Sequence, residues 1–359
     1  MKKENSIAVC VMAGGIGERF WPLSRTMRPK QLLAITGEKT MLRETIMRHA
    51  GLSDNENVYV ITTKEQSELI VKELPEIPRK NVIPEPCGRN TAPCVALGAA
   101  LMFAKDPECV MVVVSSDHHI PDSEAYRQTI SDAITLARQE HALVTIGVVP
   151  RYPETGYGYI EGKTEISYPG KTKGLKVTRF LEKPPLTVAE VLYKTPGVFW
   201  NAGMFVFRAA DILEAFARFM PESNAELKEI IKKAGTPDER AAIENYYRAV
   251  EKISIDNAVM EKADNVAVMA AEFKWNDVGS WTSASAHWPE DEKGNRLKGE
   301  IKLLECEDCI VGNYHEGLVG VIGLKDVVVI RTDDATLVCA KDKVQDVKKL
   351  LTGLDEKYR

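Results

Sequence analysis

The sequence lacks an excess of charge of one sign and any apolar run of membrane-spanning length. Its 359 residues carry 47 Lys and Arg against 52 Asp and Glu, a formal net charge of −5. The chain therefore has no overall basic field that would attract nucleic acid. No apolar run approaches the roughly 20 residues that a membrane-spanning helix needs. We expect neither nucleic acid nor a membrane among its partners, so any bound anion must rely on a local cluster of cations.

The sequence also lacks a paired cysteine framework. Seven cysteines are scattered along the chain, and residues 1–4 show no signal peptide. An odd cysteine number without a leader predicts a reducing, cytoplasmic location. Cys306 and Cys309 form a lone C-x-x-C, but structural zinc needs a second ligand pair, which His315 alone does not supply. We expect two thiols in a strand region, and the sequence leaves open whether they bind anything.

Two familiar glycine motifs are missing as well. The apolar run at residues 7–11 predicts a buried strand, and Gly14, Gly15 and Gly17 follow it. A dinucleotide fingerprint would need a third glycine where Phe20 stands, and a P-loop would need a lysine after Gly17. Both readings are therefore excluded, which leaves a plain glycine-rich turn or a different kind of anion cradle.

Cations close behind the glycines favour the cradle. Arg19, Arg25 and Lys30 follow within one loop. Glycines after a strand let backbone N–H groups approach a ligand, because no Cβ stands in the way. The combination predicts a site for a polyanion, most simply a nucleoside triphosphate.

Strands and helices alternate over the first 150 residues. The expected strands are 7–11, 58–61, 81–84, 110–114 and 142–149, and the expected helices are 40–50, 64–74, 91–105 and 123–140. This alternation predicts a doubly wound, mostly parallel α/β sheet, Rossmann-like in its layout. Ligands bind beyond the carboxyl ends of strands in such sheets. The glycine loop, Asn90 and Asp117 all follow predicted strands, and Thr91 is the expected N-cap of the third helix.

The pattern changes after residue 150. Residues 156–160 and 177–184 resemble strands of a lid or insertion, and residues 199–207 a loop that leads into a strand. Helices are expected near 209–219, 222–234 and 237–250, then a strand at 266–270. Residues 291–299 form a polar linker, followed by short β runs and a helix near 343–350. We expect a catalytic domain at 1–290 and a small, β-helix-like C-terminal domain at 291–359.

Six motifs in series carry a family resemblance. They are Gly14-Gly15-x-Gly17-x-Arg19 with its extension to Gln31, Gly88–Pro93, Ser116–His118, Phe180–Pro184, Trp200–Phe205 and Trp275–Trp281. Together they resemble the sugar-1-phosphate nucleotidylyltransferases, most closely the mannose-1-phosphate guanylyltransferase branch. The resemblance implies transfer of GMP from GTP to α-D-mannose 1-phosphate with Mg²⁺, and a homodimer through the C-terminal strands. A different nucleotide, glucose 1-phosphate, or a catalytically silent sugar-nucleotide sensor remain alternatives.

The resemblance also implies roles for individual positions. Catalysis falls to Arg19, Lys30, Asp117 and Asp277, and the two aspartates are the metal ligands. Nucleotide binding falls to Ala13, Gly14, Gly15, Gly17, Glu85, Pro86, Arg89, Asn90, Thr91 and Ser116. Sugar-phosphate binding falls to Tyr157, Gly158, Glu182, Lys183 and Asn201. Asp117 and Asp277 lie 160 positions apart, so only the resemblance pairs them. Plain structural roles, such as a helix cap for Asp117 or a turn for Asp277, remain the alternatives.

Overall fold

The computed structural model describes residues 6–359, so residues 1–4, used above for the leader expectation, lie outside the described part. The chain forms two compact units. The first contains residues up to Gly14, Met47–Ser115 and Ile120–Trp275, and the second contains Gly15–Ile46, Ser116–His119 and Asn276–Arg359. Each unit is therefore assembled from stretches that are far apart in the sequence.

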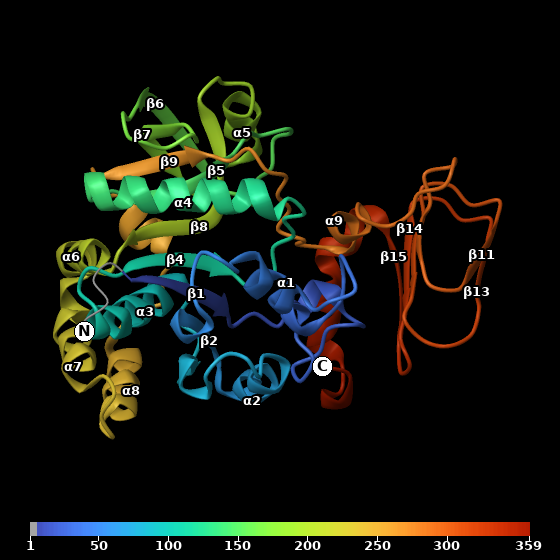
Figure 1. Cartoon of the computed structure of the whole chain (residues 1–359). Helices are drawn as coiled ribbons and strands as arrows, with labels where there is room; N and C mark the ends of the chain where they lie inside the picture. The colour runs from blue at the N-terminus through green and yellow to red at the C-terminus, as the bar shows by residue number, and fades with distance from the viewer. Residues whose placement is uncertain (1–5) are drawn as a thin grey trace. The chain divides into compact units, whose positions relative to one another are not determined.

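The first unit is built on a nine-stranded mixed sheet (Figure 1). Its strands are β1 (Ile7–Ala13), β2 (Val58–Thr63), β3 (Val82–Glu85), β4 (Val110–Ser115), β5 (Leu143–Val148), β6 (Tyr159–Glu165), β7 (Gly174–Leu181), β8 (Val198–Arg208) and β9 (Val266–Ala270). The spatial order is β3-β2-β1-β4-β8-β5-β9-β7-β6. Neighbours among β1 to β4 are parallel, as are β5 and β9, whereas β8 runs antiparallel to β4 and β5. The expected α/β fold is confirmed.

Helices follow the strands of this unit in the predicted order, except that the helix at residues 186–192 was not predicted. They are α2 (Lys64–Glu73), α3 (Thr91–Lys105), α4 (Ser123–Glu140), α5 (Leu186–Leu192), α6 (Ala209–Phe219), α7 (Asn224–Lys233) and α8 (Glu239–Ala249), with a π-helical turn at Asp256–Met260. The alanine-rich α3 packs closely on the sheet. A Cβ on Gly98 would lie 2.8 Å from Met111 and 3.0 Å from Cys10. Small residues are therefore what let α3 approach β1 and β4.

Two sequence expectations for this unit are wrong. The strands expected to belong to a lid or insertion, β6 and β7, are part of the main sheet, because β6 pairs with β8 and β7 with β9. Residues 199–207, expected as a loop that leads into a strand, lie entirely within the continuous eleven-residue strand β8. Its near-continuous burial explains the misreading, since a strand covered on both faces shows no alternation of polar and apolar residues.

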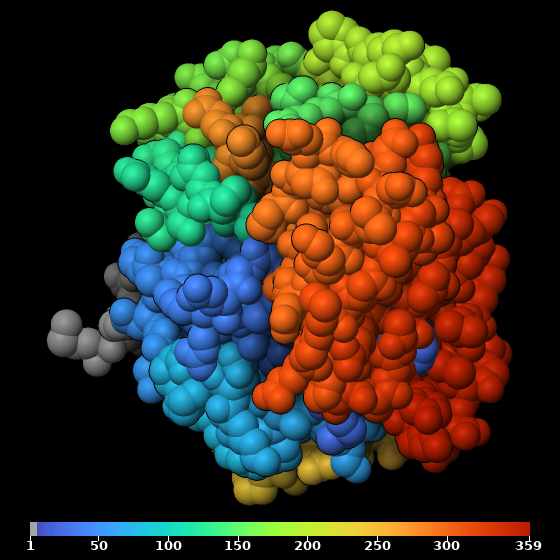
Figure 2. All heavy atoms as spheres, turned by 90° about the vertical axis from the view of Figure 1, so that its right-hand side faces the viewer, coloured from blue at the N-terminus to red at the C-terminus, as the bar shows by residue number. Residues whose placement is uncertain are grey.

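The second unit contains the short C-terminal strands. They are β10 (Arg296–Lys298), β11 (Ile301–Leu304), β12 (Ile310–Asn313), β13 (Val319–Ile322), β14 (Val327–Arg331) and β15 (Thr336–Ala340). Parallel pairs β10–β12–β14 and β11–β13 make two sheets, as in a β-helix, and β15 closes the first sheet antiparallel. The short helices α9 (Trp281–Ser285) and α10 (Val347–Leu350) also belong here. Figure 2 shows these C-terminal residues, orange to red, as one continuous surface.

Residues after the glycine loop share a core with these strands. Trp281 is fully buried, and its indole Nε1 donates to the Trp21 carbonyl at 3.1 Å. The Phe20 ring lies edge-on to the Trp281 ring at 5.1 Å. Helix α1 (Met41–Arg48) then leads the chain into the first unit. The loop that carries Arg19 and Lys30 is thus folded as part of the C-terminal unit.

Within the described residues, no helix is both long and apolar enough to cross a membrane.

Candidate active site

One lysine of the second unit connects two acidic segments. The Lys30 ammonium lies 2.8 Å from Oδ2 of Asp117 and 3.0 Å from the carbonyl oxygen of Asp277. A pair of backbone hydrogen bonds, 2.9 and 3.0 Å long, joins His119 to Asn276. The segments at 117–119 and 276–277 therefore run side by side. Proximity of Asp117 to Asp277, which sequence spacing could not provide, comes from this pairing.

The two aspartates suit a hard divalent cation. Mg²⁺ is usually held by one or two carboxylates plus substrate phosphates rather than by an all-protein cage. Among the described residues no cluster of three or more His, Cys, Asp or Glu side chains could hold a metal. Asp117 and Asp277 supply two carboxylates, and substrate phosphates would have to complete the coordination of such an ion. Their oxygen donors match the chemistry of such an ion.

Glycine 17 sets the position of Lys30. It adopts φ +76°, and a Cβ there would lie 2.3 Å from the Lys30 Cβ. The Lys30 amide donates to the Ile16 carbonyl at 3.0 Å, and the Ser24 hydroxyl donates to the Gly17 carbonyl at 2.7 Å. These bonds fold the loop back on itself. Gly17 is therefore needed both for its backbone conformation and for the space beside Lys30.

Gly15 and Arg19 of this loop are open to solvent. A Cβ on Gly15 would meet no heavy atom within 4 Å, and Arg19 is exposed. In the first unit, β1 ends at Ala13, whose carbonyl accepts from the Thr62 hydroxyl at 2.8 Å, and exposed Gly14 follows. The loop thus leaves space for an incoming anion.

Glu85 is a buried carboxyl at the end of the edge strand β3. It is 8% exposed, and its Oε1 accepts from the Tyr247 hydroxyl at 2.6 Å. Burial raises the pKa of Glu85 to about 7, although the Tyr247 hydrogen bond opposes this shift. Oε2 lies 3.4 Å from where a Gly14 Cβ would stand. The carboxyl of Glu85 therefore borders the backbone at the end of β1.

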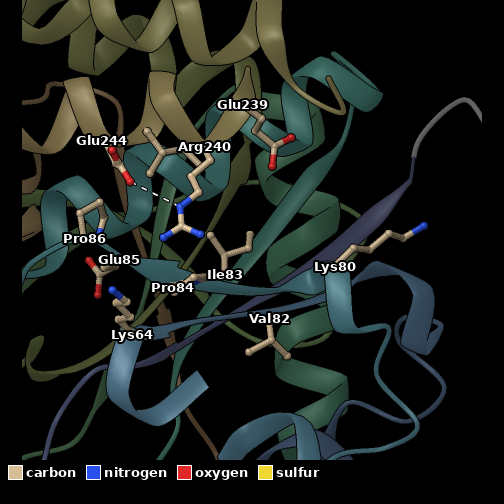
Figure 3. A pocket seen from close by; sticks show the side chains of 11 residues that line it. Lys64, Lys80, Val82, Ile83, Pro84, Glu85, Pro86, Glu239, Arg240 and Glu244 are labelled. Carbon is tan, nitrogen blue, oxygen red and sulfur yellow. Dashed lines mark hydrogen bonds and ion pairs between the residues drawn. The ribbon is translucent and has the colours of Figure 1, made fainter. Parts of the chain in front are cut away.

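A cavity of about 250 Å³ runs along β3 from Glu85 (Figure 3). Its lining residues are Lys64, Lys80, Val82, Ile83, Pro84, Glu85, Pro86, Glu239, Arg240, Ile243 and Glu244. Figure 3 shows Lys64 beside Glu85 at one end and Arg240 reaching from α8 toward β3. Six of these eleven residues are charged, and the other five are apolar. Glu85 and Pro86 thus line a hollow at the end of β3.

The Asn90 loop caps α3, but differently from the sequence expectation. Asn90, not Thr91, is the N-cap: it has φ +67°, and its Oδ1 accepts from the Thr91 amide at 2.8 Å. The Thr91 hydroxyl instead accepts from the Ile255 amide at 2.9 Å. Arg89 Nε donates to the Tyr247 carbonyl at 3.2 Å. Local sequence could not distinguish the two caps, because the competing partner lies 164 positions away.

Ser116 lies in the second unit, where it is buried and its carbonyl accepts from the Thr45 hydroxyl at 3.4 Å.

Four of the expected sugar-site residues lie together in the first unit. The backbone N–H of Asn201 donates to the Gly158 carbonyl at 2.8 Å. A Cβ on Gly158 would lie 2.5 Å from Glu182 Oε2 and 3.3 Å from the Asn201 Cβ. Lys183, at φ +48°, forms an ion pair with Glu182. Glu182 therefore lies directly over the Gly158 backbone, and only glycine permits this approach.

Aromatic rings accompany Tyr157, the fifth residue. Its ring lies edge-on to Trp200 at 5.4 Å and to Trp275 at 5.1 Å. Such edge-to-face pairs fix ring orientation. Tyr157 is thus positioned by packing.

Sequence reasoning missed Asp256 and Tyr247. Asp256 accepts from Asn201 Nδ2 at 2.9 Å, and Tyr247 donates to Glu85. Neither residue follows a strand or a glycine, so the sequence gives no local signal for either. Only the tertiary contact reveals them.

The C-x-x-C thiols donate to backbone carbonyls. Cys306 Sγ lies 3.4 Å from the oxygens of Leu304 and Val321, and Cys309 Sγ lies 3.3 Å from the Leu324 oxygen. Both side chains are buried. These contacts give the pair a structural role in the β domain.

Comparison with known proteins gives two family matches. The family described as "Nucleotidyl transferase" matches residues 8–293. The family described as "MannoseP isomerase/GMP-like beta-helix domain" matches residues 299–354. Together the two matches span nearly all described residues.

Individual proteins resemble the chain over almost its full length. A mannose-1-phosphate guanylyltransferase of Klebsiella pneumoniae is 37% identical over 97% of this chain and 74% of that protein. The mannose-1-phosphate guanylyltransferase ManC of Salmonella typhimurium is 38% identical over 97% of this chain and 73% of that protein. A crystal structure from Thermus thermophilus, described as mannose-1-phosphate geranyltransferase, has a TM-score of 0.85 at 32% identity and covers 98% of this chain and 99% of that chain.

Proposed function

Because this chain belongs to the nucleotidyl transferase family, we propose that it transfers GMP from GTP to α-D-mannose 1-phosphate, giving GDP-mannose and pyrophosphate. The observation that carries the proposal is similarity to mannose-1-phosphate guanylyltransferases over 97% of the chain. The cluster of Lys30, Asp117 and Asp277 supplies the charges that such chemistry needs.

In this reaction the protein must orient the two reactants and neutralise phosphate charge, and it does not need a general base. A phosphate oxygen of mannose 1-phosphate attacks the α-phosphorus of GTP in line, and pyrophosphate leaves. The attacking phosphate is already ionised near pH 7, so no side chain must remove a proton. Arg19 and Lys30 neutralise phosphate charge, and backbone N–H groups at Gly15 and Gly17 orient the triphosphate. Holding both reactants in line removes much of the entropic barrier.

Asp117 and Asp277 would hold the metal, which we propose to be Mg²⁺. When bound, the ion supplies positive charge to the phosphate oxygens. Lys30 keeps the Asp117 carboxylate in place through the 2.8 Å contact. The chain's own contribution would be two carboxylates, of which Lys30 holds that of Asp117.

Base and sugar recognition are proposed for the first unit. Glu85 and Pro86, with the Asn90 loop, would read guanine, whose N1 and N2 donors suit a carboxylate or carbonyl. Glu182 and Lys183 would bind the sugar phosphate beside Gly158. The cavity along β3 and the close approach of Glu182 to Gly158 support these roles.

A substrate panel tests the function. Pyrophosphate release is measured for GTP, UTP, dTTP and ATP, each with mannose 1-phosphate and with glucose 1-phosphate. We expect the highest kcat/KM for GTP with mannose 1-phosphate. A higher value for another pair would reassign the substrates, and GDP-mannose binding without any turnover would favour the silent sensor instead.

We also propose that the chain forms a homodimer through its C-terminal strands. Leu304 of β11 and Ile322 of β13 are register partners, and both are exposed, at 56% and 68%. Leu318 and Val338 are exposed nearby in sequence. Large apolar side chains exposed on a small sheet favour a protein interface. Light scattering should show a dimer that Ile322→Glu weakens.

Two further expectations are retained as proposals. A boundary near residue 290 between the catalytic and C-terminal domains is supported by family matches that end at 293 and begin at 299. A reducing, cytoplasmic location is supported by the seven cysteines, all free within the described residues.

A further inference from the structure

The side chain of Asn201 has little hydrogen-bonding capacity left for a sugar. Its Oδ1 accepts from the Thr145 hydroxyl and from the Gly203 amide, both at 3.1 Å. Its Nδ2 donates to Oδ1 of Asp256 at 2.9 Å. An amide oxygen has two lone pairs, so the acceptor side of Asn201 is filled. Asn201 therefore cannot offer a hydroxyl the acceptor-and-donor pair that its residue type suggests.

The partner of the Asn201 side-chain N–H is Asp256, an acidic residue close to the expected sugar-site residues Gly158, Glu182 and Lys183. Asp256 opens the π-helical turn Asp256–Met260. Such turns are frequent at functional sites. Burial, and then the Glu182 carboxylate, raise the pKa of Asp256 to about 7. The geometry places them near each other as well: Asn201 contacts Asp256, and Asn201 Cβ and Glu182 Oε2 lie 3.3 and 2.5 Å from where a Gly158 Cβ would stand.

Glu182 is fixed from several sides. Its backbone amide donates to Glu261 Oε1 at 3.1 Å, and its carboxylate pairs with Lys183. Glu261 Oε2 in turn accepts from Asn257 at 3.0 Å, on the turn that Asp256 opens. Glu261 thus links the backbone of Glu182 to the turn that carries Asp256. Lys183 and Glu261 are charged neighbours in this set of contacts.

A carboxyl pair suits neighbouring hydroxyl groups. An ionised carboxylate only accepts hydrogen bonds, whereas a protonated one also donates. Two nearby carboxyls hold a proton between them more readily than one alone. Such a pair can donate to one sugar oxygen and accept from the next.

We propose that Asp256 is a sugar-recognition residue that, together with Glu182, binds the hydroxyl groups of a hexose 1-phosphate, and that Asn201 positions Asp256. This role rests on the proposed function, because it presumes a sugar-phosphate substrate.

Steady-state kinetics of the full chain test the role. The variants are Asp256→Ala, Asp256→Asn, Asn201→Ala and the double variant that combines Asp256→Ala with Asn201→Ala. Asp264→Asn is the matched control. Asp264 is an exposed aspartate of the same unit, paired with Arg218 at 3.1 Å. KM for mannose 1-phosphate is measured at saturating GTP, and KM for GTP at saturating sugar phosphate.

We expect Asp256→Ala to raise KM for the sugar phosphate by at least about tenfold, the loss of one hydrogen bond to a charged group, with KM for GTP unchanged. Asp256→Asn keeps an acceptor for Asn201 and should show a smaller rise. Because Asn201 acts through Asp256, the double variant should be no worse than Asp256→Ala within about threefold. Asp264→Asn should behave as wild type.

Unchanged sugar KM in Asp256→Ala, or an equal rise in both KM values, would overturn the role. Additive losses in the double variant would overturn the positioning by Asn201. If the wild type turns over no substrate pair, the proposed function fails by itself. Calorimetry with mannose 1-phosphate then decides: weaker binding to a folded Asp256→Asn chain supports the role, and equal or absent binding in both proteins overturns it.

Discussion

The Lys30 ammonium contacts Asp117 Oδ2 at 2.8 Å and the Asp277 carbonyl at 3.0 Å. These partners lie 87 and 247 positions from Lys30 in the sequence. The Lys30 side chain is only 6% exposed, so water screens its pairing with Asp117 weakly. One cation therefore connects the glycine loop to both acidic segments of the second unit.

Loss of the Asp117 carboxylate should reduce catalysis strongly. We expect Asp117→Asn to lower kcat/KM by ~10²–10³, the usual effect of removing one electrostatic group from a transition-state site. The control is Asp342→Asn, an aspartate with a 75% exposed side chain in the same unit. Pyrophosphate release measures both. Full activity in Asp117→Asn would refute its proposed catalytic and metal-binding roles.

Removal of divalent cations should abolish turnover reversibly. Treatment with a chelator is expected to stop pyrophosphate release, and added Mg²⁺ to restore it, because two carboxylates and the nucleotide phosphates need a shared cation. Asp277→Asn should need more Mg²⁺ for half-maximal activity than the wild type. Turnover that persists after exhaustive chelation would contradict a metal role for both aspartates.

Gly17→Ala should damage the loop through both strain and collision. The left-handed backbone costs roughly 1–2 kcal/mol for a residue with a Cβ, and the new Cβ would lie 2.3 Å from the Lys30 Cβ. We expect a lower thermal midpoint and reduced kcat. Gly15→Ala, which meets no atom within 4 Å, is the stability control and should melt as the wild type does. Equal melting of both variants would rule out this use of Gly17.

The buried Glu85 carboxyl should make stability depend on pH. Its pKa is about 7 in the folded chain against 4.5 ordinarily, so between these values the folded state binds more protons than the unfolded state. The contribution of Glu85 to the free energy of unfolding is therefore greatest below about pH 4.5, and it is lost as pH rises toward 7. Glu85→Gln removes that loss.

Thermal unfolding at pH 5 and pH 8 checks this sign. The midpoint of Glu85→Gln, relative to wild type, should be higher at pH 8 than at pH 5. The control is Glu68→Gln, an exposed glutamate with a 61% exposed side chain, which should shift equally at both values. A parallel shift in Glu85→Gln as well would mean that Glu85 does not titrate differently on folding.

Strong local patterns were sufficient to predict the elements of the fold. The apolar runs of β1, β2 and β4 and the helix at Ser123–Glu140 were predicted to within about two residues at each end. These elements could be predicted because hydrophobic periodicity and helix capping depend on residues that are neighbours in the sequence. Strands β6 and β7 were expected in a lid or insertion, because the sequence does not show which strands pair.

At the candidate site, too, local sequence determined some features and tertiary structure determined others, as the glycine loop after β1 illustrates. By itself, the sequence determined a strand, flexible glycines and nearby cations, because these are local properties of residue type and spacing. Tertiary structure alone decided that Lys30 meets Asp117 and Asp277, that the Asn201 side-chain oxygen accepts from Thr145, and that Asn201 donates to Asp256. Those relationships depend on hydrogen bonds between residues tens to hundreds of positions apart, and no local pattern records such partners.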